Sequence, residues 1–246
     1  YIGGTGKTPT CVEIFLILKK LNKRPSFIRK KYKSFKDEVL LLKKVGKVYE
    51  NKKRKNAIED AIRNKSDVLI LDDGFQDISI KKDISIICFN EKQWIGNGLM
   101  IPSGPLREEL SALKRVDYVI INGEKNTHIE KKILEKNKSI KIYYIEYKPE
   151  NISIFKNKKV ICFAGIGNPI NFFNTLEKNQ IDIIDKIGFP DHYTYSDQEI
   201  EKLIEKAKQN SAILLTTEKD YLRINENYKK NINFLRIKPE MKNKEQ

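Results

Sequence analysis

The chain has 246 residues, with 48 Lys or Arg against 33 Asp or Glu, which gives a formal net charge of +15. A chain of this length buries a sizeable core and forms one large domain or two modest ones. No run reaches the roughly 18 apolar residues of a membrane span, and the three cysteines show no CxxC spacing, so a cysteine-based zinc site or disulfide framework is excluded. The positive charge favours phosphates, nucleic acid or anionic lipid head groups, although its even spread fits a compositional bias equally well.

The chain opens on the residues of a phosphate-binding P-loop: Gly3, Gly4, Thr5, Gly6, Lys7 and Thr8. Glycines let successive N–H groups point at phosphate oxygens, while Lys7 adds a charge near the β/γ-phosphates and the Thr8 hydroxyl is placed for Mg²⁺. An apolar run at residues 11–18 predicts a helix whose N-terminus faces the phosphates. Because a P-loop follows a buried strand and only two residues precede this one, we expect the sequence to be truncated at its N-terminus.

Strand-like and helix-like segments alternate after this loop. Strands are predicted at residues 25–28, 45–49, 68–71, 84–89 and 118–121, and helices at residues 37–44, 57–63 and 124–136. Continuous apolar strands separated by amphipathic helices indicate a parallel sheet covered on both faces. The predicted fold class is therefore α/β, with a P-loop NTPase-like parallel sheet.

The alternation changes near residue 142. Residues 143–147 and 152–155 predict two strands with no room for a helix between them, after which a second strand–helix alternation begins at residue 160. We therefore predict a P-loop nucleotide-binding lobe at residues 1–141, a β-strand linker at 142–158 and a smaller C-terminal α/β lobe at 159–246. The polar residues after Lys238 are expected to lie outside the folded part.

Two carboxylates follow the apolar strand at residues 68–71, where a Walker B acid belongs. Asp72 and Asp73 would lie at the carboxyl edge of the sheet, from which one of them can hold Mg²⁺ opposite Thr8. A simple Asp-Gly turn would need only one Asp and no P-loop nearby. The combination therefore predicts a metal–nucleotide site.

A short motif at residues 64–67, Asn-Lys-Ser-Asp, matches the guanine-reading pattern of GTPases. Its position is wrong, because it precedes the Walker B-like strand, whereas a base-reading motif follows a later strand. Residues 64–67 are better explained as the end of a helix running into a turn. Partitioning-type ATPases carry a signature lysine at the position that Ile2 occupies here. The misplaced guanine motif and the absent lysine both argue against a switch protein.

Two further loops carry candidate residues whose roles the sequence leaves open. Arg107 can stabilise phosphoryl charge and Glu108 can position a metal, or both can be solvated charges in a helical turn. His192 follows Asp191 in a loop after a strand, where such a pair can orient a general base or form an ordinary turn. His128 falls in a charged helix and is expected to be exposed to solvent.

Taken together, these segments resemble the tetraacyldisaccharide 4′-kinase family, the lipid A 4′-kinases. The matching segments occur in family order over nearly the whole chain: residues 3–9, 72–76, 96–108, 163–169, 189–192 and 216–220. A P-loop alone is generic, but the ordered set is specific. The resemblance implies transfer of the ATP γ-phosphoryl group to the 4′-hydroxyl of a lipid A disaccharide 1-phosphate. It also implies Mg²⁺ and a two-lobed fold joined by a β-strand linker.

The resemblance further implies where in the cell the protein acts and what it binds. The family works on the cytoplasmic face of the bacterial inner membrane, so anionic lipids of that surface are expected partners and nucleic acid is not. The full-length protein would be peripheral or anchored through an N-terminal helix that this sequence lacks.

Site roles carried over from the resemblance fall into three groups. The phosphate-binding residues are those of the P-loop, residues 3–8, and the metal set is Thr8, Asp72, Asp73, Gln76 and Glu108. The catalytic residues are Asp37, His192, Lys7 and Arg107. Asp37 would be the general base with His192 as its helper, since phosphoryl transfer needs positioning, charge neutralisation and a group to take the hydroxyl proton. The segment before Asp37 lacks the glycines of the family's Arg-Gly-Tyr-Gly stretch.

Two other classes remain compatible with parts of the sequence. A nucleotide-driven switch ATPase could use the basic surface on a membrane or on nucleic acid, and the missing guanine motif and signature lysine argue against it. A P-loop kinase of a soluble small molecule would have similar active-site residues, so the residues alone do not separate it from a lipid kinase.

Overall fold

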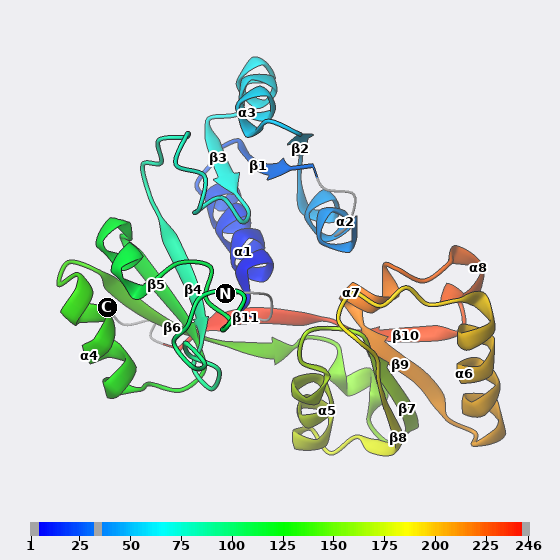
Figure 1. Ribbon diagram of the computed structural model, residues 1–246. Helices are drawn as coiled ribbons and strands as arrows, with labels where there is room; N and C mark the ends of the chain where they lie inside the picture. Colours follow the sequence, from blue (N-terminus) through cyan, green and yellow to red (C-terminus); the bar gives the residue numbers. More distant parts are fainter. Residues whose placement is uncertain (1–4, 32–35, 243–246) are drawn as a thin grey trace. The chain divides into compact units, whose positions relative to one another are not determined.

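The computed structural model describes residues 5–31 and 36–242 and confirms the predicted α/β class. The chain divides into two compact units (Figure 1). The first consists of Tyr1–Tyr32, Leu42–Tyr147 and Pro239–Gln246, and the second of Lys33–Leu41 and Lys148–Lys238. No helix within the described ranges is long and apolar enough to cross a membrane.

The first unit contains a three-stranded parallel sheet in the order β2-β1-β3. Its strands are β1 (Pro25–Lys30), β2 (Val48–Asn51) and β3 (Val68–Leu71), and the helices around it are α1 (Lys7–Lys20), α2 (Lys36–Val45) and α3 (Arg54–Arg63). Successive residues of a strand point to opposite faces. Accordingly, Phe27 packs with Phe15 of α1, whereas Ile28 packs with Ala57 and Ala61 of α3. Both faces of the sheet are therefore covered, as predicted.

A four-stranded sheet of the first unit has the order β11-β6-β5-β4. Its strands are β4 (Ile86–Asn90), β5 (Tyr118–Asn122), β6 (Lys141–Pro149) and β11 (Ile237–Met241), accompanied by helix α4 (Thr127–Lys136) and the 3₁₀ helix η1 (Leu110–Arg115). Strands β4, β5 and β6 are parallel. Val119 and Ile121 of β5 are completely buried against Ile129 and Ile133 of α4. The apolar run that predicted β5 thus supplies the centre of this core.

The second unit is built on a four-stranded parallel sheet in the order β10-β9-β7-β8. Its strands are β7 (Lys159–Ala164), β8 (Asp182–Gly188), β9 (Ile213–Thr217) and β10 (Ile232–Leu235), and its helices are η2 (Ile152–Phe155), α5 (Pro169–Lys178), α6 (Asp197–Gln209), α7 (Glu218–Tyr221) and α8 (Glu226–Lys229). Val160 and Cys162 pack with α5, and Ile161 and Phe163 pack with α6. Figure 1 shows these two helices on opposite sides of the sheet.

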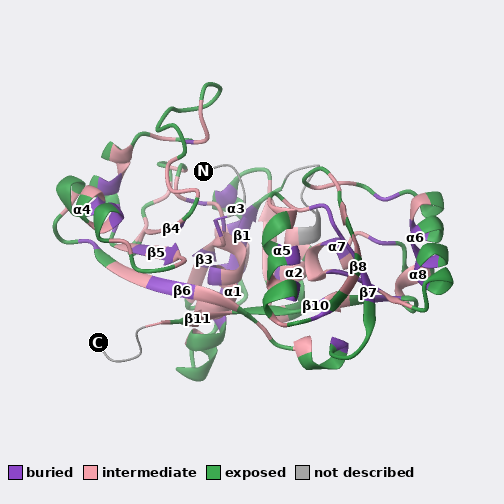
Figure 2. Ribbon diagram, turned by 90° about the horizontal axis from the view of Figure 1, so that it is seen from below, coloured by how far each residue is buried: buried purple, intermediate pink, exposed green. Residues whose placement is uncertain are grey.

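The helices of the second unit begin at residues with clear capping chemistry. The Asn168 side chain accepts a hydrogen bond from the Asn171 N–H, and Pro169 follows at the first helical position. Ser196 and Glu199 form a reciprocal capping box at the start of α6. Figure 2 shows α6 exposed along most of its length with its buried residues on one side, as expected of an amphipathic helix.

The structure corrects two expectations about local conformation. Residues 152–155 form η2 and not a strand, because the Asn151 side chain bonds to the backbone of Phe234 and Arg236 and Phe155 turns into the core. Residues 237–241 form strand β11 and are not frayed, because β11 pairs with β6 and the Lys242 N–H donates to the Tyr144 carbonyl. Pairing with an available strand outweighs the polar composition of this segment.

The main division between the two units falls between residues 147 and 148, inside the predicted linker of residues 142–158. Residues 142–147 group with the first unit and residues 148–158 with the second. Residues 36–41 group with the second unit although they are early in the sequence, and residues 239–242 group with the first. Contacts between residues far apart in the sequence decide to which unit each of these segments belongs.

Replacing Phe15 by Ala is expected to lower the free energy of unfolding of the first unit by about 3 to 5 kcal/mol. Phe15 is 2% exposed and stacks on Phe27 with a centroid distance of 4.7 Å, so its removal leaves a cavity that the sheet cannot fill. Urea denaturation monitored by fluorescence and circular dichroism measures the change. Leu16→Ala on the same helix is the control, since Leu16 is 39% exposed and should cost less than about 1 kcal/mol. Equal losses for the two variants would contradict the packing described.

Candidate functional site

The loop that ends at Gly6 presents the start of helix α1. Gly6 is the N-cap residue, with a left-handed φ of 87°, and a Cβ at this position would lie 2.0 Å from the Tyr147 hydroxyl oxygen. Tyr147 donates a hydrogen bond of 3.3 Å to the Gly6 carbonyl. Only glycine satisfies both constraints. Gly6 has no side chain that caps α1, and a helix start of this kind is suited to binding phosphate. Gly3 and Gly4 lie outside the described residues.

A buried carboxylate faces this helix start. The Thr8 hydroxyl donates to Asp72 Oδ2 at 3.4 Å, and Asp72, which directly follows β3, is 2% exposed. Arg29 of the neighbouring strand β1 lies with its Nη1 3.4 Å from the same oxygen. A buried carboxylate needs such a partner, because its desolvation is costly. The predicted juxtaposition of P-loop threonine and Walker B acid is therefore present.

Asp73 points to a different arginine. Arg107 Nη1 lies 2.8 Å from both carboxylate oxygens of Asp73. Burial acts to raise the pKa of Asp73, but the hydrogen bond and charge of Arg107, together with the charges of Lys7 and Arg54, outweigh it and hold that pKa below its usual value. Arg107 is thus part of the charged cluster that includes Lys7. Asp73 also has a left-handed φ of 57°, with Arg54 donating to its carbonyl.

Two predicted metal ligands are placed differently. Glu108 forms an ion pair with Arg115, and Gln76 is exposed. Within the described ranges, no three His, Cys, Asp or Glu side chains converge as a metal cluster. The hydroxyl and carboxylate oxygens of Thr8 and Asp72 nevertheless fit Mg²⁺, which takes hard oxygen ligands, keeps several waters and needs only one or two carboxylates. The donor set around Asp72 is therefore sufficient for a nucleotide-bound Mg²⁺.

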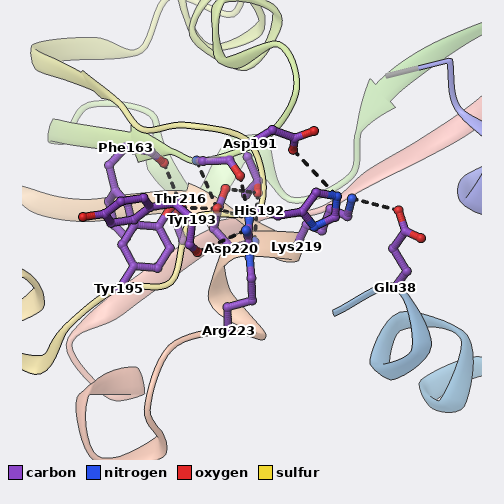
Figure 3. A network of polar contacts seen from close by, with 12 residues as sticks. Glu38, Phe163, Asp191, His192, Tyr193, Tyr195, Thr216, Lys219, Asp220 and Arg223 are labelled. Carbon is purple, nitrogen blue, oxygen red and sulfur yellow. Dashed lines mark hydrogen bonds and ion pairs between the residues drawn. The ribbon is translucent and has the colours of Figure 1, made fainter. Parts of the chain in front are cut away.

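The second unit has its own polar cluster at the carboxyl ends of its parallel strands. His192 follows β8, has a φ of 57°, and lies with Nε2 3.9 Å from Asp191 Oδ1. Lys219, which follows β9, donates to Glu38 Oε1 at 3.0 Å (Figure 3). His128 is exposed on α4, as predicted. Of the two histidines, His192 lies in the polar cluster of the second unit, whereas His128 lies on an exposed helix surface.

Asp37 lies in helix α2, but its side chain is outside the described part of the structure. The next residue, Glu38, is described and belongs to the second unit together with His192 and Lys219. The ion pair of Glu38 with Lys219 therefore ties the start of α2 to the loop after β9. The backbone of Asp37 is placed next to this contact.

Sequence reasoning left out several charged residues of these clusters. Arg29 interrupts an otherwise apolar strand and Arg54 is 8% exposed, and both bind the loop after β3. Arg29 could have been found from the sequence, because it is a cation within an apolar strand, whereas nothing in the sequence around Arg54 marked it. Asp220 is the last residue of the family-matching segment 216–220, and Arg223 lies three residues after it. The resemblance assigned no role to either residue.

A glycine loop at a helix start, with a threonine hydroxyl on a buried Asp after a parallel strand, defines the chain as a P-loop NTPase-like α/β protein. The crystal structure of LpxK from Aquifex aeolicus in complex with ATP has the same fold. Its TM-score is 0.70 at 23% identity, and the alignment covers 98% of this chain and 81% of that chain.

The family model of LpxK, tetraacyldisaccharide-1-P 4′-kinase, matches residues 1–246. The tetraacyldisaccharide 4′-kinase of Pelagibacter ubique is 44% identical over 234 residues, which are 94% of this chain and 74% of that protein. The protein of the same name from Rickettsia bellii is 33% identical over 241 residues, or 91% of this chain and 74% of that protein. The chain belongs to the tetraacyldisaccharide-1-P 4′-kinase family, and the resemblance found in its sequence is confirmed.

Replacing Glu199 by Gln should destabilise the second unit in a pH-dependent way. Hydrogen bonds from the Tyr193 hydroxyl and from Ser196 lower the pKa of Glu199 from 4.5 to about 2. A depressed carboxyl pKa stabilises the folded state above pH 4.5, and this contribution is lost as the pH falls towards 2.

Urea midpoints of the wild type and Glu199→Gln should therefore differ at pH 6 and converge between pH 4.5 and about 2. Glu205→Gln, an exposed position on the same helix, is the control and should leave the midpoint unchanged. A difference between wild type and Glu199→Gln that does not depend on pH would contradict the assignment.

Proposed function

We propose that this protein is an ATP-dependent kinase that phosphorylates the 4′-hydroxyl of a tetraacyldisaccharide 1-phosphate in lipid A biosynthesis. The observation that carries the proposal is the Thr8 hydroxyl on the buried Asp72 carboxylate, next to Lys7 at the start of α1, in a chain of this family. A P-loop and a Walker B acid bind a nucleoside triphosphate with its metal. The family membership then supplies the acceptor.

The nucleotide end of the reaction is assigned to the first unit. Lys7 and the N–H groups of the loop and of α1 hold the triphosphate, while Thr8 and Asp72 would hold Mg²⁺, which neutralises phosphate charge when bound. Arg107 stabilises the charge on the transferred phosphoryl group. Its contact with Asp73 keeps the guanidinium oriented and the Asp73 carboxylate ionised at neutral pH.

The acceptor end is assigned to the second unit. Asp37 takes the proton of the 4′-hydroxyl as the hydroxyl oxygen attacks the γ-phosphorus and the bond from that phosphorus to the bridging oxygen breaks, which releases ADP. His192 orients and supports Asp37. A carboxylate suits this step because phosphoryl transfer through a loose transition state needs positioning and modest proton removal, not a strong base. The Glu38–Lys219 ion pair supports the assignment, because it holds the residue next to Asp37.

We also propose that the protein acts at the cytoplasmic face of the bacterial inner membrane, with its anionic lipids as partners. A net charge of +15 favours such a surface. Three consecutive large apolar residues, Leu99, Met100 and Ile101, are 52%, 45% and 50% exposed, which suits contact with an acylated substrate or a bilayer interface.

The kinase proposal predicts that the protein, with ATP and Mg²⁺, transfers ³²P from [γ-³²P]ATP to a tetraacyldisaccharide 1-phosphate in mixed micelles. Mass spectrometry should place the new phosphate at the 4′ position. The matched control acceptor is the same disaccharide 1-phosphate without acyl chains. Transfer to that acceptor alone would favour a kinase of soluble molecules, and ATP hydrolysis with no transfer to either acceptor would favour a switch ATPase.

Two substitutions should separate the two ends of the reaction. Asp37→Asn should lower kcat by about 10²- to 10⁴-fold while ATP still binds, because only proton removal is lost. Lys7→Ala should lower kcat/KM for ATP by at least about 10²-fold, since a charge on the triphosphate is lost. Steady-state kinetics and nucleotide-binding titrations measure the two effects, with His128→Ala as control. Normal turnover in Asp37→Asn would move the base elsewhere.

A further inference from the structure

A completely buried carboxylate lies next to the loop that carries His192. Asp220 has no exposed surface, and its Oδ1 accepts hydrogen bonds from the Gly165 N–H at 3.0 Å and from the Tyr195 hydroxyl at 2.7 Å. Its Oδ2 accepts from the Thr217 hydroxyl, and Arg223 forms an ion pair with Oδ1 (Figure 3). A buried charge of this kind is retained only with a full set of partners.

Arg223 extends this cluster to the backbone around His192. Besides Asp220, its guanidinium donates to the Gly165 carbonyl at 2.8 Å and to the Tyr193 carbonyl at 3.2 Å. The Tyr195 ring lies 6.0 Å below the guanidinium carbon. A planar guanidinium holds several acceptors in a fixed geometry, which a lysine cannot do.

The backbone of His192 is held by the same groups. Its N–H donates to the Gly165 carbonyl at 3.1 Å, so that one carbonyl accepts from both His192 and Arg223. The carbonyl of the next residue, Tyr193, is bound by Arg223. His192 has a φ of 57°, a left-handed conformation that a residue with a side chain adopts at a steric cost and that persists where its surroundings over-determine it.

We propose that Asp220 and Arg223 are positioning residues that hold His192 in the conformation needed for phosphoryl transfer. The inference rests on the proposed role of His192. Asp220 holds Gly165 through its N–H, and Arg223 holds the same residue through its carbonyl. Gly165 then binds the N–H of His192, and Arg223 binds the carbonyl of the next residue, Tyr193. The three loops involved follow the parallel strands β7, β8 and β9, so the sheet sets their spacing.

A double-mutant cycle between Arg223 and His192 tests this role. Arg223→Gln should lower kcat by at least about tenfold while KM for ATP stays unchanged, because the positioned group and not the nucleotide site is disturbed. In a His192→Ala background, Arg223→Gln should lower kcat by less than about twofold, since no imidazole remains to be positioned. Arg223→Lys should recover part of kcat, and Arg236→Gln, a surface arginine of the same unit, should leave kcat unchanged.

A purely structural role of Arg223 would predict equal losses in both backgrounds, and that result would overturn the proposal. Wild-type kcat in Arg223→Gln, with His192→Ala impaired, would overturn it too while leaving the kinase function intact. If Arg223→Gln does not fold, as judged by its thermal transition, the same cycle is run with Arg223→Lys.

Amide hydrogen exchange separates this inference from the proposed kinase function, because it needs no activity. Arg223→Lys should speed exchange of the His192 amide, while the Leu214 amide in β9 keeps its wild-type rate. A wild type that transfers no phosphate would refute the kinase function, and the exchange result would still decide whether Arg223 holds His192. Unchanged exchange at His192 would overturn the positioning role.

Discussion

Parallel strand pairing is the constraint on which both polar clusters depend. In the first unit, Ile28 of β1 pairs with Leu71 of β3, so the residues that follow, Arg29 and Asp72, come to lie side by side. In the second unit, β7, β8 and β9 run in the same direction and end at one edge. Loops at such edges gather residues from distant parts of the sequence. The register of the strands therefore sets which charged groups meet.

Both clusters place an arginine on a buried aspartate, with different consequences. Arg29 and Asp72 are 4% and 2% exposed and lie where a metal and a triphosphate would bring further charge. Arg223 and Asp220 are bound by backbone groups on several sides and hold a loop in place. Desolvation makes each pair costly in itself. Such pairs give orientation more than stability, which is what a phosphoryl-transfer site needs.

The local elements were largely predictable, because apolar runs and capping residues act over a few positions. The P-loop helix, the strand before Asp72 and the turn after α3 follow from residues within one or two turns of each other. Strand β11 and the 3₁₀ helix η2 were not predictable in this way. Strand β11 depends on pairing with β6, and η2 depends on the Asn151 side chain reaching the backbone of Phe234 and Arg236.

The sequence by itself determined the α/β class, the P-loop with its Walker B acid and the family, because each rests on residues close together or in a fixed order. Only the tertiary structure decided that Glu108 pairs with Arg115 while Arg107 holds Asp73. It also decided that Asp220 and Arg223 bind the loop of His192. The physical reason is that a charged side chain takes its partner from whatever the fold brings within about 3 Å, and spacing along the chain does not contain that information.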